Sequence, residues 1–302
     1  MSLAGGVTAL RLTLLPLLVT PSLEAQSAPT LEITTRPARL TRGTVGLILV
    51  RAARRAPRLA SLAGRAEGEP LHFRPAAGGG FAAFIGTGIE GGDSVVITLF
   101  PVRPGGERDS LDLAVPVAGG SYRREQLRVE TKYATPDSAA QRRIGEEIEE
   151  ARAIARDSHA TPRKWTGPFR LPRPGRVTSP FGTERILNGE IQSRHLGTDF
   201  AGKVGAPVRA ANAGIVALVA DFYLAGTVVY LDHGEGIVTG YFHLSKATVA
   251  AGETVARGQL IGRVGKSGRV TGPHLHWVAR YGRITVDPMS LMRLRREVRS
   301  KK

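Results

Sequence analysis

Short apolar or alternating segments, separated by turns rich in glycine and proline, follow one another through residues 30–130. Residues 44–50, 94–100 and 111–117 are examples, since each is β-branched or alternates between apolar and polar side chains. Regular short strands between turn residues favour a β-sandwich. We therefore expect a β-sandwich-like accessory domain at residues 30–130. No cluster of titratable side chains suitable for catalysis lies in this region, which indicates a binding or spacer module.

The periodicity changes to that of an amphipathic helix in residues 137–160. Apolar side chains recur at spacings of four, three and four residues, as Ile144, Ile148, Ala151 and Ala155. Asp137 is suited to the start of this helix. Its glutamates are interpreted as part of a solvated face, namely Glu146, Glu147, Glu149 and Glu150. We expect a connector helix that packs on a domain, followed by an extended, proline-rich linker at residues 161–176.

Short strands and turns return over residues 177–290, so the chain as a whole is predicted to be mainly β. Five of the seven histidines lie between His195 and His276. We expect a second domain here, built as an antiparallel β-sheet or sandwich, and candidate chemistry concentrates in it.

The composition limits the classes of protein that this chain can form. Of 302 residues, 42% are hydrophobic and 23% are charged, which argues against a mainly disordered chain and against a multi-span membrane protein. At roughly 100–200 residues per domain, this length predicts two domains. The absence of cysteine excludes a disulfide scaffold, a thiol nucleophile and a cysteine-ligated zinc.

The chain is strongly basic, with 42 Lys and Arg against 26 Asp and Glu and a net charge of +16. Part of this excess forms a basic tail at residues 291–302. Because no nucleic-acid-binding motif accompanies the charge, we expect no nucleic-acid partner. An anionic cell-wall or membrane surface is the expected partner of the charge. The alternative is a solvated tail without a role.

The first 25 residues form a separate element. An apolar run surrounds and follows Arg11 and ends before Ala25, and it is shorter than the roughly 20 apolar residues that span a bilayer. We interpret residues 1–25 as a secretory signal peptide and expect an exported protein, in the periplasm, the cell envelope or the medium. A membrane anchor and a misassigned start codon are the alternatives.

Histidine and aspartate in residues 177–290 form the pattern of a metal site. His195 and Asp199 flank Gly197 in the stretch HLGTD, where the glycine permits a turn that lets both side chains converge. His274 and His276 are two residues apart, so in a strand they point to the same face. Imidazole and carboxylate are zinc ligands, and a catalytic zinc has three protein ligands and one position for water. The commonest helical zinc-protease motif, HExxH, is absent.

Residues 177–288 resemble the lysostaphin/LytM-type zinc metallopeptidases, whose domain is also called the duplicated hybrid motif fold. The matching stretches are SPFGTERILNG (179–189), SRHLGTDFAGKVGAPVRAANAGIV (193–216), VVYLDHGEGIVTGYFHLS (228–245) and VAAGETVARGQLIGRVGKSGRVTGPHLHWVA (249–279). They cover rather more than a third of the chain.

The resemblance implies a role for each motif residue. His195, Asp199 and His276 match the ligands of Zn²⁺, and His243 and His274 match two catalytic histidines that do not bind the metal. It further implies an exported endopeptidase that uses a metal-activated water to hydrolyse peptide bonds in peptidoglycan. Every motif position is filled.

Other functions stay open at this point. The main alternative is a non-catalytic regulator of cell-wall hydrolases on the same fold, although such relatives lack some ligands. A carrier-type β-module is a third hypothesis, because residues 249–265 resemble half of a biotinyl or lipoyl domain. The cleaved bond is open between a Gly–Gly bridge, a D-Ala–diaminopimelate cross-link and a bond in a non-wall protein. The sequence indicates no oligomeric state.

Five further residues near the motifs are either structural or border the site. Arg185 and Asn188 could line a substrate groove or belong to a turn. His233 is interpreted as structural rather than catalytic. Tyr241 could border the site, because strand alternation places it on the same face as His243, or pack in the core. Trp277 alternates away from the site and is expected in the core.

Overall fold

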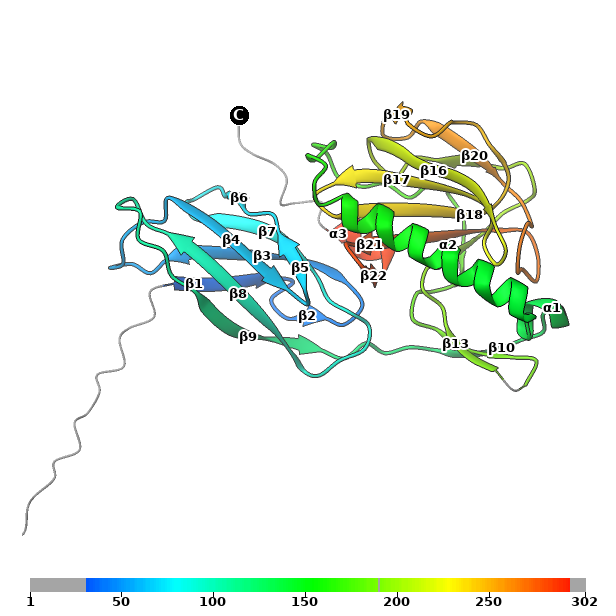
Figure 1. The fold of residues 1–302 in the computed structure, drawn as a ribbon, viewed down its shortest axis with the longest axis horizontal. Coiled ribbons are helices and arrows are strands. Elements are labelled where there is room, and N and C mark those ends of the chain that lie inside the picture. The colour runs from blue at the N-terminus through cyan, green and yellow to red at the C-terminus, as the bar shows by residue number, and fades with distance from the viewer. Residues whose placement is uncertain (1–30, 190, 294–302) are drawn as a thin grey trace, which may run out of the picture.

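The computed structural model describes residues 31–189 and 191–293, which are 46% strand and 12% helix. The predicted mainly β fold is confirmed. The predicted signal peptide and residues 294–302 of the basic tail lie outside the described residues. Strands β1–β9 form an N-terminal lobe, and strands β11–β22 with helix α3 form a C-terminal lobe (Figure 1).

The N-terminal lobe contains two sheets that pack against each other. One has the order β1(Leu31–Arg36), β3(Val45–Ala52), β7(Phe81–Gly86), β6(Arg74–Pro75). The other has the order β2(Leu40–Thr41), β9(Leu111–Ala118), β8(Ser94–Val102), β4(Ser61–Ala66), β5(Glu69–Leu71). Ile48 and Ile85 of the first sheet and Ile97 and Leu99 of the second lie in one apolar cluster. Alternating strands bury one face each, which explains the periodicity of the sequence.

The two lobes share a hydrophobic core. Leu47, Leu49 and Phe84 of the N-terminal lobe belong to the same buried cluster as Trp165 and Tyr281. Strand β3 is therefore apolar on both faces, since its alternate residues pack on the second sheet and on the C-terminal lobe. The backbone at residue 86 approaches the Tyr281 ring so closely that a Cβ there would lie 2.8 Å from the Tyr281 Cβ, so only glycine fits.

The C-terminal lobe is built on one large antiparallel sheet. Its main order is β11(Val177–Ser179), β14(Thr198–Ala201), β21(His274–Tyr281), β18(Ile237–Ala247), β17(Gly226–Gly234), β16(Gly214–Phe222), β19(Thr254–Val255). Three more strands pair beside it, β15(Pro207–Arg209), β20(Leu260–Val264) and β22(Ile284–Val286), and α3(Pro288–Arg293) follows. The segment that suggested a carrier module contributes β19 and β20 to this sheet.

The segments between the lobes depart from the sequence-based expectations. Strand β10(Arg124–Leu127), within the range expected for the accessory domain, pairs in parallel with β12(Glu184–Leu187), which pairs with β13(Ile191–Arg194). A short helix α1(Thr131–Ala134) follows. The expected linker at 161–176 is anchored by Trp165 and Phe169, both buried in the shared core.

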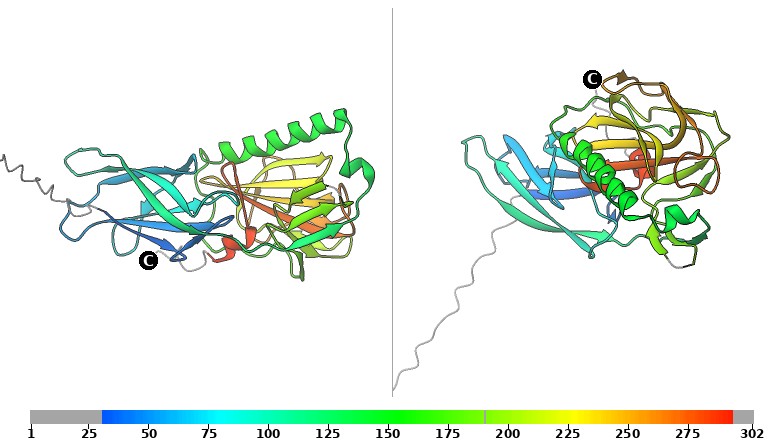
Figure 2. Two further views of the ribbon diagram at one scale, coloured as in Figure 1. Left: turned by 90° about the horizontal axis from the view of Figure 1, so that it is seen from below. Right: turned by 45° about the vertical axis from the view of Figure 1, so that its right-hand side comes forward.

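Helix α2(Ser138–Asp157) lies along the outside of the C-terminal lobe (Figure 2). It begins where Asp137 accepts a hydrogen bond from the Ala140 amide at 2.8 Å. Ala151 and Ala155 are buried, but Ile148 is 42% exposed, so the predicted apolar stripe packs only at its C-terminal end. Among the described residues, no helix has the length and apolar character that crossing a membrane requires.

One glutamate of α2 corrects the prediction of a wholly solvated charged face. Both carboxylate oxygens of Glu147 lie 2.9 Å from the Tyr223 amide and accept its hydrogen bond. Glu147 also pairs with Arg143, whose Nε lies 2.7 Å from Oε1. The side chain thus fixes α2 to the end of β16.

Candidate metal centre and active site

Strand pairing brings the three predicted metal ligands together. Asp199 of β14 lies opposite His276 of β21, and His195 precedes β14. Asp199 Oδ1 is 3.0 Å from His195 Nε2 and 2.7 Å from His276 Nδ1, and the two nitrogens are 2.9 Å apart. Gly197 is required for space, because a Cβ there would lie 2.5 Å from the His276 ring. The three residues form a compact group of potential metal ligands.

The chemistry of this group fits zinc. His195 Nδ1 donates to the Pro180 carbonyl oxygen at 2.9 Å, which leaves the lone pair of Nε2 directed at Asp199. Although burial raises the pKa of Asp199, its close contacts with the His276 and His195 imidazoles outweigh this and hold the pKa far below its ordinary value. Burial also lowers the pKa of His276 to about 4. Two imidazoles and one carboxylate are a donor set of catalytic zinc sites.

Arg185 holds the other oxygen of Asp199. Its Nη2 donates to Asp199 Oδ2 at 2.8 Å, and its Nε donates to Glu125 Oε1 at 2.7 Å. Ser179 Oγ donates to the same glutamate oxygen at 3.0 Å and lies 3.2 Å from His195 Nδ1. Arg185 is thus part of a set of hydrogen-bonded residues that supports the predicted ligands. The sequence did not identify Glu125 and Ser179 as members of this set. Ser179 is the first residue of the matching stretch SPFGTERILNG, whereas Glu125 lies outside all the matching stretches.

Asn188 combines a turn with an anchoring role. Its φ of 53° lies in the left-handed region that asparagine tolerates between β12 and β13. Its side chain accepts from the Val129 amide at 2.9 Å and donates to the Val129 carbonyl at 3.0 Å. Asn188 therefore fixes the segment that follows β10 beside the site.

The two predicted catalytic histidines face each other beside the metal ligands. Their ring centroids are 4.8 Å apart, and that of His243 is 5.8 Å from that of His276. His243 Nδ1 donates to the Ser267 carbonyl and His274 Nδ1 to the Gly272 carbonyl, both at 2.8 Å. Each ring therefore keeps Nε2 available, and His274 Nε2 lies 3.7 Å from Asp199 Oδ1.

A β-bulge places the His243 side chain on a different face of β18 from the one that regular strand alternation predicts. Tyr241 pairs with Val229 but Leu244 pairs with Thr227, so Phe242 and His243 together oppose one residue. His243 has a φ of 59°, a conformation rarely adopted by residues other than glycine. Burial, followed by the charges of the neighbouring histidines, lowers the pKa of His243 well below its ordinary value.

Three nearby side chains are structural. Tyr241 is fully buried, and its hydroxyl accepts from the Ala211 amide at 2.9 Å, so it packs in the core rather than at the site. Trp277 is also fully buried. His233 donates from Nδ1 to the Ala213 carbonyl at 2.8 Å, and its Nε2 lies 2.8 Å from the Thr239 hydroxyl. Burial lowers the pKa of His233 to about 4.

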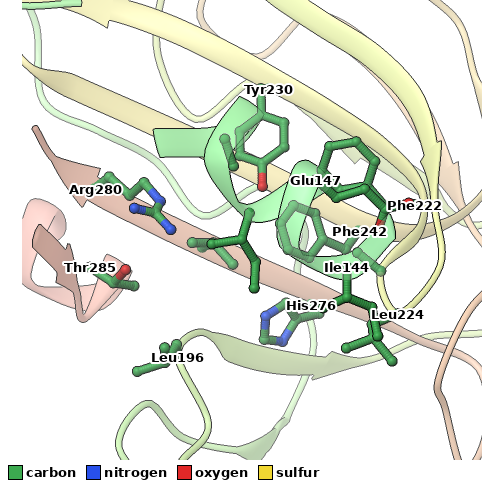
Figure 3. Close-up of a pocket in the computed structure, with 14 residues that line it drawn as sticks. Ile144, Glu147, Leu196, Phe222, Leu224, Tyr230, Phe242, His276, Arg280 and Thr285 are labelled. Carbon is green, nitrogen blue, oxygen red and sulfur yellow. The ribbon is translucent and has the colours of Figure 1, made fainter. Parts of the chain in front are cut away.

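Two hollows adjoin the group of predicted metal ligands. The polar groove, of about 300 Å³, is lined by His243, His274, the loop at 269–273, and Glu125 and Leu127 of β10. The apolar pocket, of about 170 Å³, lies between α2 and β21 and includes His276 in its lining (Figure 3). The polar groove reaches Asp199 and the apolar pocket reaches His276, so each hollow borders a predicted ligand.

Comparison with known proteins identifies the same region. Residues 193–288 match Peptidase family M23. Over 105 residues the chain is 48% identical to the peptidoglycan DD-endopeptidase ShyA of Vibrio cholerae, and over 104 residues it is 42% identical to ShyC of that organism. Each match covers 34% of this chain and 24% of the relative, so the chain matches about a quarter of their length.

One solved structure is similar over most of the chain. It comes from Pseudomonas aeruginosa and carries the assignment peptidase M23. It aligns with 84% of this chain and 95% of its own, with a TM-score of 0.61 and 25% sequence identity. The similarity therefore extends beyond the C-terminal lobe.

Proposed function

Because residues 193–288 form a Peptidase M23 domain, as the lysostaphin/LytM-type motifs implied, we propose that this protein is an exported, zinc-dependent endopeptidase that hydrolyses peptide bonds in peptidoglycan. The observation that carries this proposal is the convergence of His195, Asp199 and His276 beside His243 and His274.

The five site residues divide into three predicted metal ligands and two histidines that transfer protons. His195 Nε2, Asp199 Oδ1 and His276 Nδ1 would hold zinc, which when bound supplies a Lewis acid that makes water more acidic and polarises a carbonyl. His243 and His274 keep their rings fixed through Nδ1, so proton transfer falls to Nε2. One Nε2 accepts a proton from the attacking water, and a protonated Nε2 donates to the leaving amine or to the developing negative charge on the carbonyl oxygen.

Peptidoglycan is the proposed substrate on two grounds. The relatives with the highest identities quoted above are named peptidoglycan DD-endopeptidases. The hollows that border Asp199 and His276 also leave room for an extended peptide at the site, which suits an endopeptidase. Export by the predicted signal peptide would bring the protein to this substrate, and its basic tail would favour anionic wall or membrane surfaces.

Digestion of purified peptidoglycan tests the proposal directly. The full mature chain, loaded with zinc, is expected to release peptides whose masses identify the cleaved bond, and a chelator should abolish the release. A non-catalytic regulator would instead release nothing alone and would stimulate an added wall amidase. This second outcome would overturn the proposed endopeptidase activity.

Export is tested separately by N-terminal sequencing of protein from the envelope fraction. The mature chain is expected to begin near Gln26, directly after Ala25. An intact Met1 in a soluble cytoplasmic pool would overturn the proposed export. An intact N-terminus in the membrane fraction would replace the signal peptide by an anchor.

A further inference from the structure

The apolar pocket connects the metal centre to Arg280, which forms no ion pair with a carboxylate of residues 31–189 or 191–293. Its lining is mainly apolar, and the larger apolar side chains include Ile144, Ile148, Phe222, Leu224, Phe242 and Val278. Figure 3 shows Arg280 and Thr285 on one side of the pocket and His276 and Leu224 on the other. A molecule held at the metal centre can therefore extend through an apolar passage towards a cation.

Strand β21 sets the distance between His276 and Arg280, the polar residues at the two ends of the apolar pocket. His276, Val278 and Arg280 alternate onto one face of β21, while the residues between them are buried in the core. At about 3.4 Å per residue, His276 and Arg280 lie about 14 Å apart along the strand. An extended peptide covers this distance with about four residues.

Arg280 is short of hydrogen-bond acceptors. Its Nη1 donates to the Arg283 carbonyl oxygen at 3.3 Å, and its Nε is buried without a partner. Within residues 31–189 and 191–293, no carboxylate forms an ion pair with Arg280. Glu147 also lines the pocket, but its carboxylate is engaged by the Tyr223 amide and Arg143. Glu149 acts on Arg280 only from beyond ion-pair distance. A partly buried guanidinium without a directly paired carboxylate is costly, and a carboxylate matches its geometry with two parallel hydrogen bonds.

We propose that the apolar pocket is a substrate subsite for an acidic peptide, in which an apolar stretch next to the cleaved bond lies against α2 and β21 and a carboxylate binds Arg280. The proposal rests on the proposed peptidase function and specifies the substrate class. It also gives α2 a role, because Ile144 and Ile148 form a wall of the subsite where the helix does not pack on the sheet.

A matched pair of soluble peptides tests the subsite. Both contain a D-Ala–diaminopimelate cross-link, whose methylene groups supply the apolar stretch. They differ only in the terminal D-Ala of the acceptor strand, which carries either a free carboxylate or a carboxamide. A hydrogen bond to a charged group contributes about 1.5–3 kcal/mol, so we expect kcat/KM to be about 10- to 100-fold higher for the carboxylate peptide.

Variants of Arg280 assign that preference to the pocket. In Arg280→Ala, kcat/KM for the carboxylate peptide should fall to the value for the amide, while the amide peptide is little affected. Arg280→Lys should restore part of the preference, because it keeps the charge without the planar fork. Arg263→Ala, on β20 of the same sheet and outside the pocket, is the control and should retain the full preference. An equal preference in wild type and Arg280→Ala overturns the subsite.

A binding measurement separates this proposal from the proposed activity. Calorimetric titration of both peptides into His243→Ala, with and without Arg280→Ala, requires no hydrolysis. Tighter binding of the carboxylate peptide that is lost with Arg280→Ala supports the subsite, even if neither peptide is cleaved by the wild type. Cleavage of both peptides without any such difference in binding supports the peptidase and overturns the subsite.

Discussion

Glu125 and Arg185 lie directly opposite each other in the parallel pair of β10 and β12, and Glu125 Oε1 is 2.7 Å from Arg185 Nε. The same guanidinium continues to Asp199 Oδ2 at 2.8 Å. A residue of the segment that leaves the N-terminal lobe therefore lies two contacts from a predicted metal ligand. This segment is part of the site and not only a connection to it.

Removing the charge of Glu125 is expected to weaken metal binding. Glu125→Gln keeps the shape of the side chain but loosens its hold on Arg185, and such outer contacts are typically worth 10- to 100-fold in metal affinity. We expect the zinc dissociation constant, measured by competition with a chromophoric chelator, to rise about tenfold. Glu184→Gln is the control, because Glu184 pairs with the exposed Arg124 in the same strand pair. Equal zinc affinities in the two variants would refute the role of Glu125.

Loss of one predicted ligand should remove the metal. The wild-type mature chain should carry about one zinc per molecule, and His276→Ala should carry almost none when measured by metal analysis after dialysis, because three protein ligands form such a site. Unfolding curves of both proteins show whether the variant is still folded. Full zinc occupancy in a folded His276→Ala protein would overturn the ligand assignment.

The two non-ligand histidines should separate metal binding from activity. His243→Ala and His274→Ala are expected to retain zinc and to lose on the order of 10²–10⁴-fold in hydrolysis rate, the usual contribution of general acid–base catalysis. Rates are measured on the same soluble peptide, with zinc content measured in parallel. A variant that cleaves at the wild-type rate would exclude its histidine from proton transfer.

His233 should make the fold sensitive to acid. Its pKa is lowered by burial to about 4, against about 6.5 in the unfolded chain. Between these values the unfolded state binds more protons, so stability falls as pH drops through this window, by about 3 kcal/mol in total. The full contribution is present above pH 6.5.

The variant His233→Gln isolates this effect. Urea unfolding with a chelator present, at pH 7 and pH 4.5, should show a smaller loss of stability on acidification in His233→Gln than in the wild type. The other histidines are common to both proteins and cancel in the difference. Equal losses in the two proteins would show that His233 is not the group that titrates.

Local periodicity and spacing anticipated much of this molecule. The alternating segments became strands, and the two-residue spacing of His274 and His276 placed both on one strand face. Asp137 begins the predicted helix. These features depend on residues close in sequence, where backbone geometry alone determines which side chains are neighbours.

Features that depend on distant contacts were not visible in the sequence. Glu125 reaches Arg185 across 60 residues through a parallel pair that no local pattern marks. The bulge at His243 breaks the alternation that placed Tyr241 on its face, because one extra residue reverses which side each residue points to. Ile148 belongs to an apolar stripe, but the space opposite it is the apolar pocket rather than core.

Strand β3 is buried on both of its faces, and this affects how the molecule unfolds. Leu47 and Leu49 pack on the C-terminal lobe, while Ile48 and Val50 pack within the N-terminal lobe, so neither core can open without disturbing this strand. The two lobes therefore form one cooperative unit, and the mature chain should melt in a single calorimetric transition. A fragment that begins at the C-terminal lobe would leave the apolar surface around Tyr281 in water, and we expect it to aggregate rather than to act as a free-standing enzyme.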